Sequence, residues 1–168
     1  MKLFILLTVA SWIAIRPLQK KQPQMYMNSF LSISIGSILI LTLVIQIVID
    51  IEPWFSPRYV VPLAGMIISS AMNTVSLAAE RFQSEYDKKT PYIEARRIAL
   101  RVSLIPIINS LFAVGLVALP GMMTGQILSG VSPLIAAQYQ IVVMTMLFSA
   151  SGISASLYLV LTNRSLRL

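Results

Sequence analysis

The sequence predicts an all-α, polytopic helical membrane protein with about five transmembrane helices and one short amphipathic helix on the cytoplasmic side. Apolar residues make up 57% of the 168 residues and charged residues only 11%, whereas an average soluble domain is about 45–50% apolar and about 25% charged. The charges also fall in clusters separated by long uncharged runs. Since a helix needs roughly 20 apolar residues to cross a bilayer, we interpret residues 1–168 as a single transmembrane domain.

The uncharged runs place five spans in order along the chain, at about 3–15, 29–49, 60–79, 102–119 and 139–162. The first span has only thirteen residues, which is short for a complete crossing. We therefore interpret the chain as one that begins inside a transmembrane helix and lacks earlier spans.

The orientation of the spans follows from the distribution of Lys and Arg. Eleven of the thirteen cations fall in the 16–21 connection, the 80–101 loop and the C-terminal tail. Cytoplasmic loops carry such an excess, so the C-terminus is expected in the cytoplasm and the N-terminus outside, in a plasma or inner membrane. The net charge of +7 is then a topology signal, and nucleic acid is not an expected partner.

The absent residue types exclude several kinds of chemistry. The chain has no Cys and no His, which excludes disulfides, thiolate nucleophiles, imidazole metal ligands and Ser-His-Asp triads. It has no phosphate-binding loop of the G-x-x-x-x-G-K-[ST] type. No carboxylate lies at the centre of a span, where proton-coupled transporters place one. We expect no enzyme activity and no bound cofactor, and a transport bundle of this kind would take its energy from another polypeptide.

Small residues spaced four apart mark the second and fifth spans. Ser32 and Gly36 form such a pair in the second span, and Gly152 and Ser156 form another in the fifth. This spacing lets another helix approach closely.

The third span carries a narrow polar stripe, because its small and polar residues recur at spacings of three and four. Polar groups in lipid are costly unless they face other helices or water, so the stripe is predicted to point into the bundle. Tight helix packing and a translocation path both explain it. The stripe comprises Gly65, Ser69, Met72, Asn73, Ser76 and Glu80.

The loop between the third and fourth spans, 80–101, contains a predicted helix. Thr90-Pro91 resembles a helix start, with a capping residue followed by proline. Glu94, Arg97 and Arg101 share one face of that helix. This amphipathic helix suits either anionic lipid headgroups or a groove on a partner protein.

The densest motif follows the fourth span, which itself contains Asn109 and Gly115. Pro120-Gly121 is predicted to break the helix, and the uncharged stretch after it could re-enter the membrane. Gly121 and Gly125 would permit close backbone contact. Two thioethers and a hydroxyl sit between these glycines; thioethers suit soft metals or adaptable packing. They belong to Met122, Met123 and Thr124.

Four runs of sequence resemble signatures of the iron-export ABC permease family (FetB type), to which plant aluminium-sensitivity permeases are also similar. The runs are VPLAGMII at 61–68 followed by AMN at 71–73, LIPIINS at 104–110, VGLVALPGMMTGQI at 114–127 and QYQIVV at 138–143. The resemblance implies an integral-membrane subunit that works with a separate cytoplasmic ATPase, which would bind the ATP.

The chain departs from the family pattern in two places. Family members begin with roughly two more spans. Their loop before the fourth span also contains a Gly-Ala turn resembling an ATPase-coupling segment, whereas here 85–89 runs directly into Thr90-Pro91.

The resulting hypothesis is a permease subunit that exports a metal ion such as iron, held by oxygen or thioether groups, and that acts as a homodimer in the lipid membrane. The alternative is a passive channel or structural membrane subunit without ATP coupling. The expected path residues are Ser69, Met72, Asn73, Ser76, Asn109, Met122, Met123 and Thr124. Expected ATPase-coupling residues are Glu80, Glu94, Arg97 and Arg101. Expected helix-break and packing positions are Gly65, Gly115, Pro120, Gly121 and Gly125.

Overall fold

The computed structural model describes residues 2–18, 23–49, 57–114 and 120–166. Every regular element that is assigned within these ranges is a helix. In order, they are α1 (Lys2–Ala14), α2 (Pro23–Leu43), the π-helical continuation η1 (Val44–Ile49), α3 (Pro57–Asp87), α4 (Tyr92–Ala113), α5 (Gly121–Leu128) and α6 (Pro133–Leu166).

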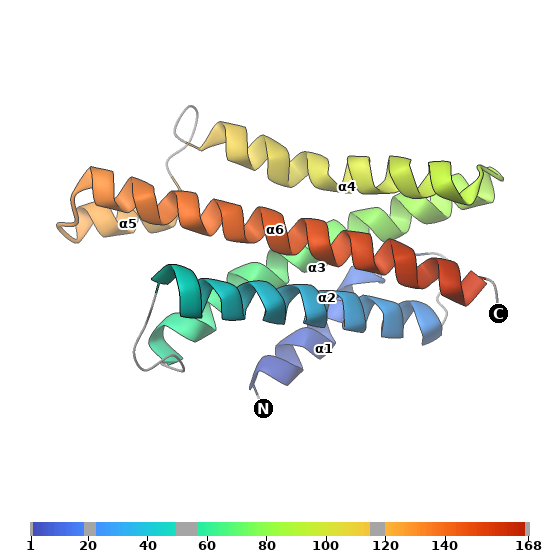
Figure 1. Ribbon diagram of the computed structural model, residues 1–168, viewed down its shortest axis with the longest axis horizontal. Helices are drawn as coiled ribbons and strands as arrows, with labels where there is room; N and C mark the ends of the chain where they lie inside the picture. The colour runs from blue at the N-terminus through green and yellow to red at the C-terminus, as the bar shows by residue number, and fades with distance from the viewer. Residues whose placement is uncertain (1, 19–22, 50–56, 115–119, 167–168) are drawn as a thin grey trace.

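The four long helices run along the long axis of an elongated bundle (Figure 1). Helix α3 is central, because it packs against α1, α2, α4 and α6. Helix α6 also packs against α2, α4 and α5. The α3–α4 turn and the C-terminus lie at one end of the bundle, and the α5–α6 turn lies at the other (Figure 1).

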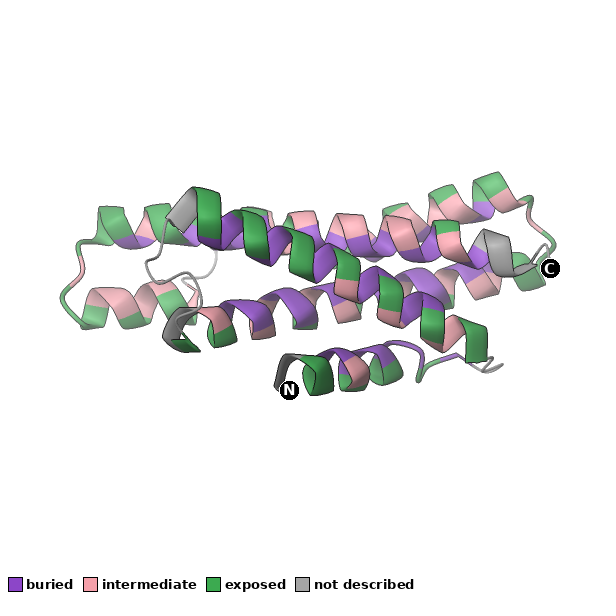
Figure 2. Ribbon diagram, turned by 60° about the horizontal axis from the view of Figure 1, so that its bottom comes forward, coloured by how far each residue is buried: buried purple, intermediate pink, exposed green. Residues whose placement is uncertain are grey.

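Small residues contribute many of the contacts between the helices, beside buried large residues such as Ile67 and Leu159, and many other large apolar residues face outward. Ala71 on α3, Ala99 on α4 and Ser154 on α6 are fully buried, whereas Ile35 on α2 and Ile141 on α6 are exposed. In Figure 2 the buried residues form stripes along the facing sides of the helices, and the exposed ones lie on the outer sides. Lipid tails are as apolar as leucine, so helices in a membrane associate by close packing of small residues rather than by hiding large ones. This arrangement is that of a helical membrane protein.

Three helices are long and apolar enough to cross a membrane, counted within the described residues: Pro23–Ile47, Val60–Asp87 and Pro133–Thr162. They correspond to the predicted spans 29–49, 60–79 and 139–162. Phe4–Ala14 is a shorter apolar helix, and α4 covers 102–113 of the predicted span 102–119. The helices extend several residues beyond these spans: α2 and α6 begin earlier, in uncharged sequence, and α3 continues into charged residues.

The α3–α4 connection is a tight turn rather than a loop. Residues 80–87, predicted to lie in the loop, form the last turns of α3. The backbone N–H of Lys89 donates to the carbonyl oxygen of Tyr86 (2.9 Å), and that of Thr90 donates to Glu85 (3.2 Å). This pair of bonds is a Schellman helix end. Lys89 takes the left-handed conformation there, with φ of 62°.

Candidate functional site

The polar stripe of α3 lies on the outside of the chain and not inside the bundle. Ser69, Asn73 and Glu80 are exposed, and Met72 and Ser76 are intermediate. The face of α3 that packs into the bundle instead carries Ala64, Ile67, Ala71, Val75, Ala78 and Phe82. The prediction that the stripe points into the bundle is therefore wrong for a single chain. Periodicity shows that one face of a helix differs from the others. It does not show which way that face points, because a membrane helix is apolar toward both the lipid and the protein core.

One hydroxyl beside the stripe does reach a neighbouring helix. Ser70 and Ser151 of α6 are hydrogen-bonded through their side-chain oxygens, at 2.9 Å. A second interhelical bond joins α4 to α6, where the hydroxyl of Tyr92 donates to the carbonyl oxygen of Leu159 (2.9 Å). These bonds fix α3 and α4 relative to α6.

The path residues expected after α3 are not brought together. Asn109 is exposed on α4, and Met122 is exposed at the start of α5. Met123 and Thr124 are half-buried, and the Thr124 hydroxyl donates to the carbonyl oxygen of Pro120 at 3.2 Å within its own helix turn. Of these four, Met123 lines the cavity described next.

That cavity has a volume of about 310 Å³ and lies where α4, α5 and α6 meet. The groups in its lining that could coordinate a metal ion are the thioethers of Met123 and Met144, the carboxamide of Gln140 and the hydroxyl of Thr145. Gln140 is only 5% exposed, and its Oε1 atom has no hydrogen-bond partner. The remaining lining is apolar: Leu111, Val114, Ala137 and Ile141. Gln140 and Met144 were not predicted as site residues, although their spacing of four in an apolar run places them on one helix face.

No cluster of three or more Asp or Glu side chains that would suit a metal ion occurs within the described residues. Oxygen and thioether groups are the donors that this chain offers in and around the cavity.

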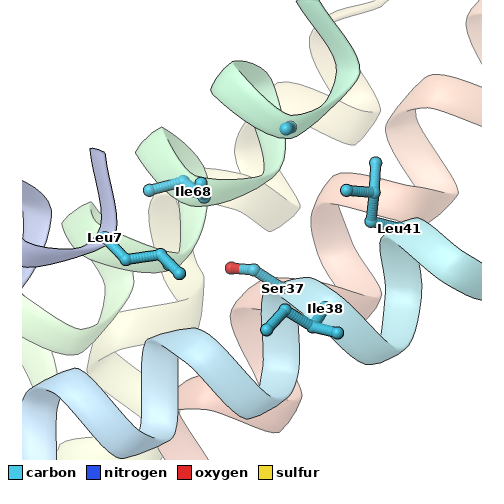
Figure 3. Close-up of a pocket in the computed structure, with 6 residues that line it drawn as sticks. Leu7, Ser37, Ile38, Leu41 and Ile68 are labelled. Carbon is cyan, nitrogen blue, oxygen red and sulfur yellow. The ribbon is translucent and has the colours of Figure 1, made fainter. Parts of the chain in front are cut away.

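A much smaller cavity, of about 10 Å³, lies between α1, α2 and α3 (Figure 3). The hydroxyl of Ser37 points into it, between Leu7 and Ile68. Ser37 is buried and its oxygen has no hydrogen-bond partner. A cavity of this size holds about one water molecule, so it is no passage for a larger solute.

The glycines expected to mediate close packing do not do so in the single chain. No atom lies within 4 Å of the position that a side-chain carbon would take at Gly65, Gly121 or Gly125. Gly115 lies outside the described residues. Helix α5 begins at Gly121, directly after Pro120. The close contact occurs instead at Gly36 of α2, where an added Cβ would meet the hydroxyl of Ser154 and lie 3.2 Å from its backbone nitrogen.

The coupling residues predicted in the 80–101 segment are all on the surface. Glu80 lies near the end of α3, and Glu94, Arg97 and Arg101 follow along α4; all four are exposed.

Glu85, which was not predicted as a site residue, organises the turn between α3 and α4. It is buried, and its carboxylate lies 2.8 Å from Arg81 and 3.4 Å from Lys88. It also accepts a 3.2 Å hydrogen bond from the hydroxyl of Thr90, which therefore does not cap α4. Nothing in the sequence distinguishes this carboxylate from its charged neighbours.

Two exposed apolar side chains stand beside these charges. Ile93, in the first turn of α4, is 81% exposed, and Tyr86, in the last turn of α3, is 47% exposed. Both side chains lie at the α3–α4 end of the bundle, near the exposed Glu94.

Comparison with known proteins agrees with the membrane architecture. The profile of the family described as "Uncharacterised protein family (UPF0014)" matches residues 1–98 and 88–166. The UPF0014 membrane protein slr1647 of Synechocystis is 37% identical over 90% of this chain and 64% of its own length. The probable iron export permease protein FetB of Escherichia coli is 34% identical over 83% of this chain and 58% of its own length. The ALUMINUM SENSITIVE 3 protein of Arabidopsis thaliana is 34% identical over 68% of this chain and 47% of its own length.

The chain thus spans about half to two thirds of the length of these relatives. No solved structure gives a significant match. Both the extent of the family match and the helical bundle with its three membrane-length helices lead to one conclusion. The chain belongs to the UPF0014 family of membrane proteins.

Proposed function

We propose that this chain is the membrane-embedded permease subunit of an ABC-type transporter that exports a metal ion such as iron. In this proposal a separate cytoplasmic ATPase supplies the energy and binds the ATP. The similarity to a protein named as a probable iron export permease supports the transport class and the cargo. The absence of a phosphate-binding loop from the sequence is consistent with a separate energy source.

The observation that carries the proposal is the firm helical hairpin at the α3–α4 end. Glu85 joins the last turns of α3 to the turn itself through Arg81, Lys88 and Thr90. The hairpin therefore holds the exposed side chains of Ile93 and Tyr86 at the end of the bundle, beside the exposed Glu94. A partner that moves the permease must push on an element that does not deform, and this hairpin meets that need through α3, which contacts four other helices.

The α4–α5–α6 cavity is the proposed binding site for the transported ion within the chain. Thioethers suit soft and borderline metal ions, and carboxamide oxygens suit harder ones. Gln140 brings a buried oxygen without a partner to this cavity, and such an oxygen is costly unless something binds it.

The test is recovery of the ATPase with the permease. The tagged chain is purified in mild detergent from native membranes, and ATP-binding subunits that copurify are detected by photolabelling with 8-azido-ATP. Ile93→Asp should lower recovery about tenfold or more, because it puts a charge into the centre of the contact. Leu134→Asp is the matched control: Leu134 is 72% exposed at the opposite end of the bundle, and its substitution should leave recovery unchanged.

Two outcomes would count against the proposal. One is that no ATP-binding subunit copurifies with the unsubstituted chain. The other is ferrous ion flux into liposomes that contain this chain alone and no ATP, which would identify a passive channel.

A further inference from the structure

The outward face of α3 differs from the outward faces of α2 and α6. Between Val61 and Tyr86, α3 exposes no large hydrophobic residue. Over comparable lengths, α2 exposes Leu31, Ile35, Ile38, Leu39 and Leu43, and α6 exposes Ile135, Ile141, Phe148 and Val160. What α3 exposes between these two residues is Pro62, Ser69, Asn73 and Glu80. This surface is unsuited to contact with lipid tails.

Asn73 is the most costly member of this face. It lies midway along the membrane-length segment Val60–Asp87, about 20 Å of helix from either end at 1.5 Å per residue. Its carboxamide makes no hydrogen bond to any described residue, and it is exposed. A carboxamide has two donors and an acceptor, and in the hydrocarbon region each unsatisfied group costs free energy. The face therefore requires a polar cover at mid-membrane depth.

We propose that two copies of this chain pair through the outward face of α3, with Asn73 at the centre of the contact. This inference goes beyond the proposed function, because it assigns the outward face of α3 to the contact between two copies of the chain. A two-fold axis brings the same patch of each copy together. A carboxamide carries both a donor and an acceptor, so the N–H of each Asn73 can donate to the side-chain oxygen of the other.

The charges near the α3–α4 turn favour a second copy over another occupant. Glu80 of α3 and Arg97 and Arg101 of α4 are exposed, and the ion pairs of the described residues do not include them. Because α3 and α4 are antiparallel and joined by the turn at 88–91, these residues lie at similar depth. Two copies with parallel axes therefore bring the carboxylate of one to the level of the guanidinium groups of the other, in both directions.

The backbone of this face also allows close approach. Gly65 lies two turns before Asn73 and on the same side, with Ser69 between them. No atom lies within 4 Å of the Cβ position at Gly65, so a neighbouring helix can come near there. Small residues at a four-residue spacing are typical of tight contacts between membrane helices.

The absence of cysteine from the chain permits a direct test. Asn73→Cys and Ser69→Cys are each made singly, and native membranes are treated with copper phenanthroline. A disulfide-linked dimer of twice the chain mass should form at both positions. Ile35→Cys is the matched control: it is exposed in the middle of α2 and should give little dimer.

A second set of variants tests the role of the carboxamide itself. In the Ser69→Cys background, Asn73→Leu should lower the dimer yield about three- to tenfold, as expected for loss of interhelical hydrogen bonds. Asn73→Gln should restore much of the yield. All variants are compared at equal membrane content.

The proposal is overturned if position 35 links as well as positions 69 and 73, if neither position 69 nor 73 links, or if either links to a different polypeptide. Copurification of the ATPase is measured separately in the unsubstituted chain. Dimer formation without ATPase recovery would refute the proposed function alone, and ATPase recovery without dimer would refute this inference alone.

Discussion

At the scale of single residues, the α3–α4 turn contains one side chain in an unfavourable backbone conformation. Lys89 occupies the left-handed position of the Schellman end, with φ of 62°. Glycine is the usual residue there, because any side chain costs about 1–2 kcal/mol in that conformation. The sequence does not reveal the left-handed conformation of Lys89, because two successive lysines in a charged stretch are typical of an ordinary solvated loop.

Replacing Lys89 with glycine should stabilise the chain. The gain should be up to about 1 kcal/mol, since relief of the left-handed penalty exceeds the extra entropy of glycine in the unfolded state. Thermal unfolding in detergent measures it. Lys89→Ala is the control, because it removes the same charge and keeps a Cβ; equal unfolding temperatures for the two variants would contradict the argument.

Ser37 supports a second prediction at this scale. Its hydroxyl points into the small α1–α2–α3 cavity without a partner (Figure 3). Ser37→Ala removes a buried unsatisfied group and should stabilise the chain by about 1 kcal/mol. The matched control is Ser70→Ala, which breaks the 2.9 Å bond to Ser151 and should destabilise it. The same unfolding assay compares them, and destabilisation by both would show that Ser37 has a partner.

At the scale of the elements, the contact between α2 and α6 depends on one glycine. Ser32 and Gly36 were predicted to allow close approach of another helix, and both are buried. Ser154 of α6 fills the space at Gly36. The predicted spacing of small residues was therefore informative in α2. In the α5 segment the same spacing, Gly121 and Gly125, leaves open space, because spacing alone does not say whether a helix lies opposite.

Gly36→Val should force α2 and α6 apart. A branched side chain at this position meets the backbone of Ser154, which cannot rotate away, and overpacking of this kind costs about 1–3 kcal/mol. The expected result is a lower unfolding temperature in detergent. Ile38→Val, two residues along on the exposed side of α2, should change it little, and a similar loss at both positions would refute the close contact.

At the scale of the whole molecule, the distribution of charge was enough to predict a helical membrane protein and the position of its long helices. It did not predict where the helices end, since α3 and α6 extend several residues beyond the uncharged runs. The residues Glu80 to Asp87 form good helical turns once α4 and the Glu85 contacts support them. Charge marks the edge of the hydrocarbon layer, not the end of the helix.

The candidate site was predicted less well, for two physical reasons. The polar stripe of α3 was recognised, but its direction was reversed, because lipid and protein core are equally apolar to a membrane helix. Gln140 and Met144 meet Met123 only through the folding of α5 back against α6, and a sequence pattern does not contain that contact. Within-helix spacing is readable from the sequence; contact between distant helices is not.

The bond between Ser70 and Ser151 has a consequence for biosynthesis. Its two partners are 81 residues apart in the chain, so at about 5–20 residues per second the ribosome makes the second about 4–16 seconds after the first. Until α6 has been made, Ser70 lacks its partner for this bond. A chain whose translation stops before α6 therefore lacks both the partner of this hydroxyl and one of the four helices that pack against α3.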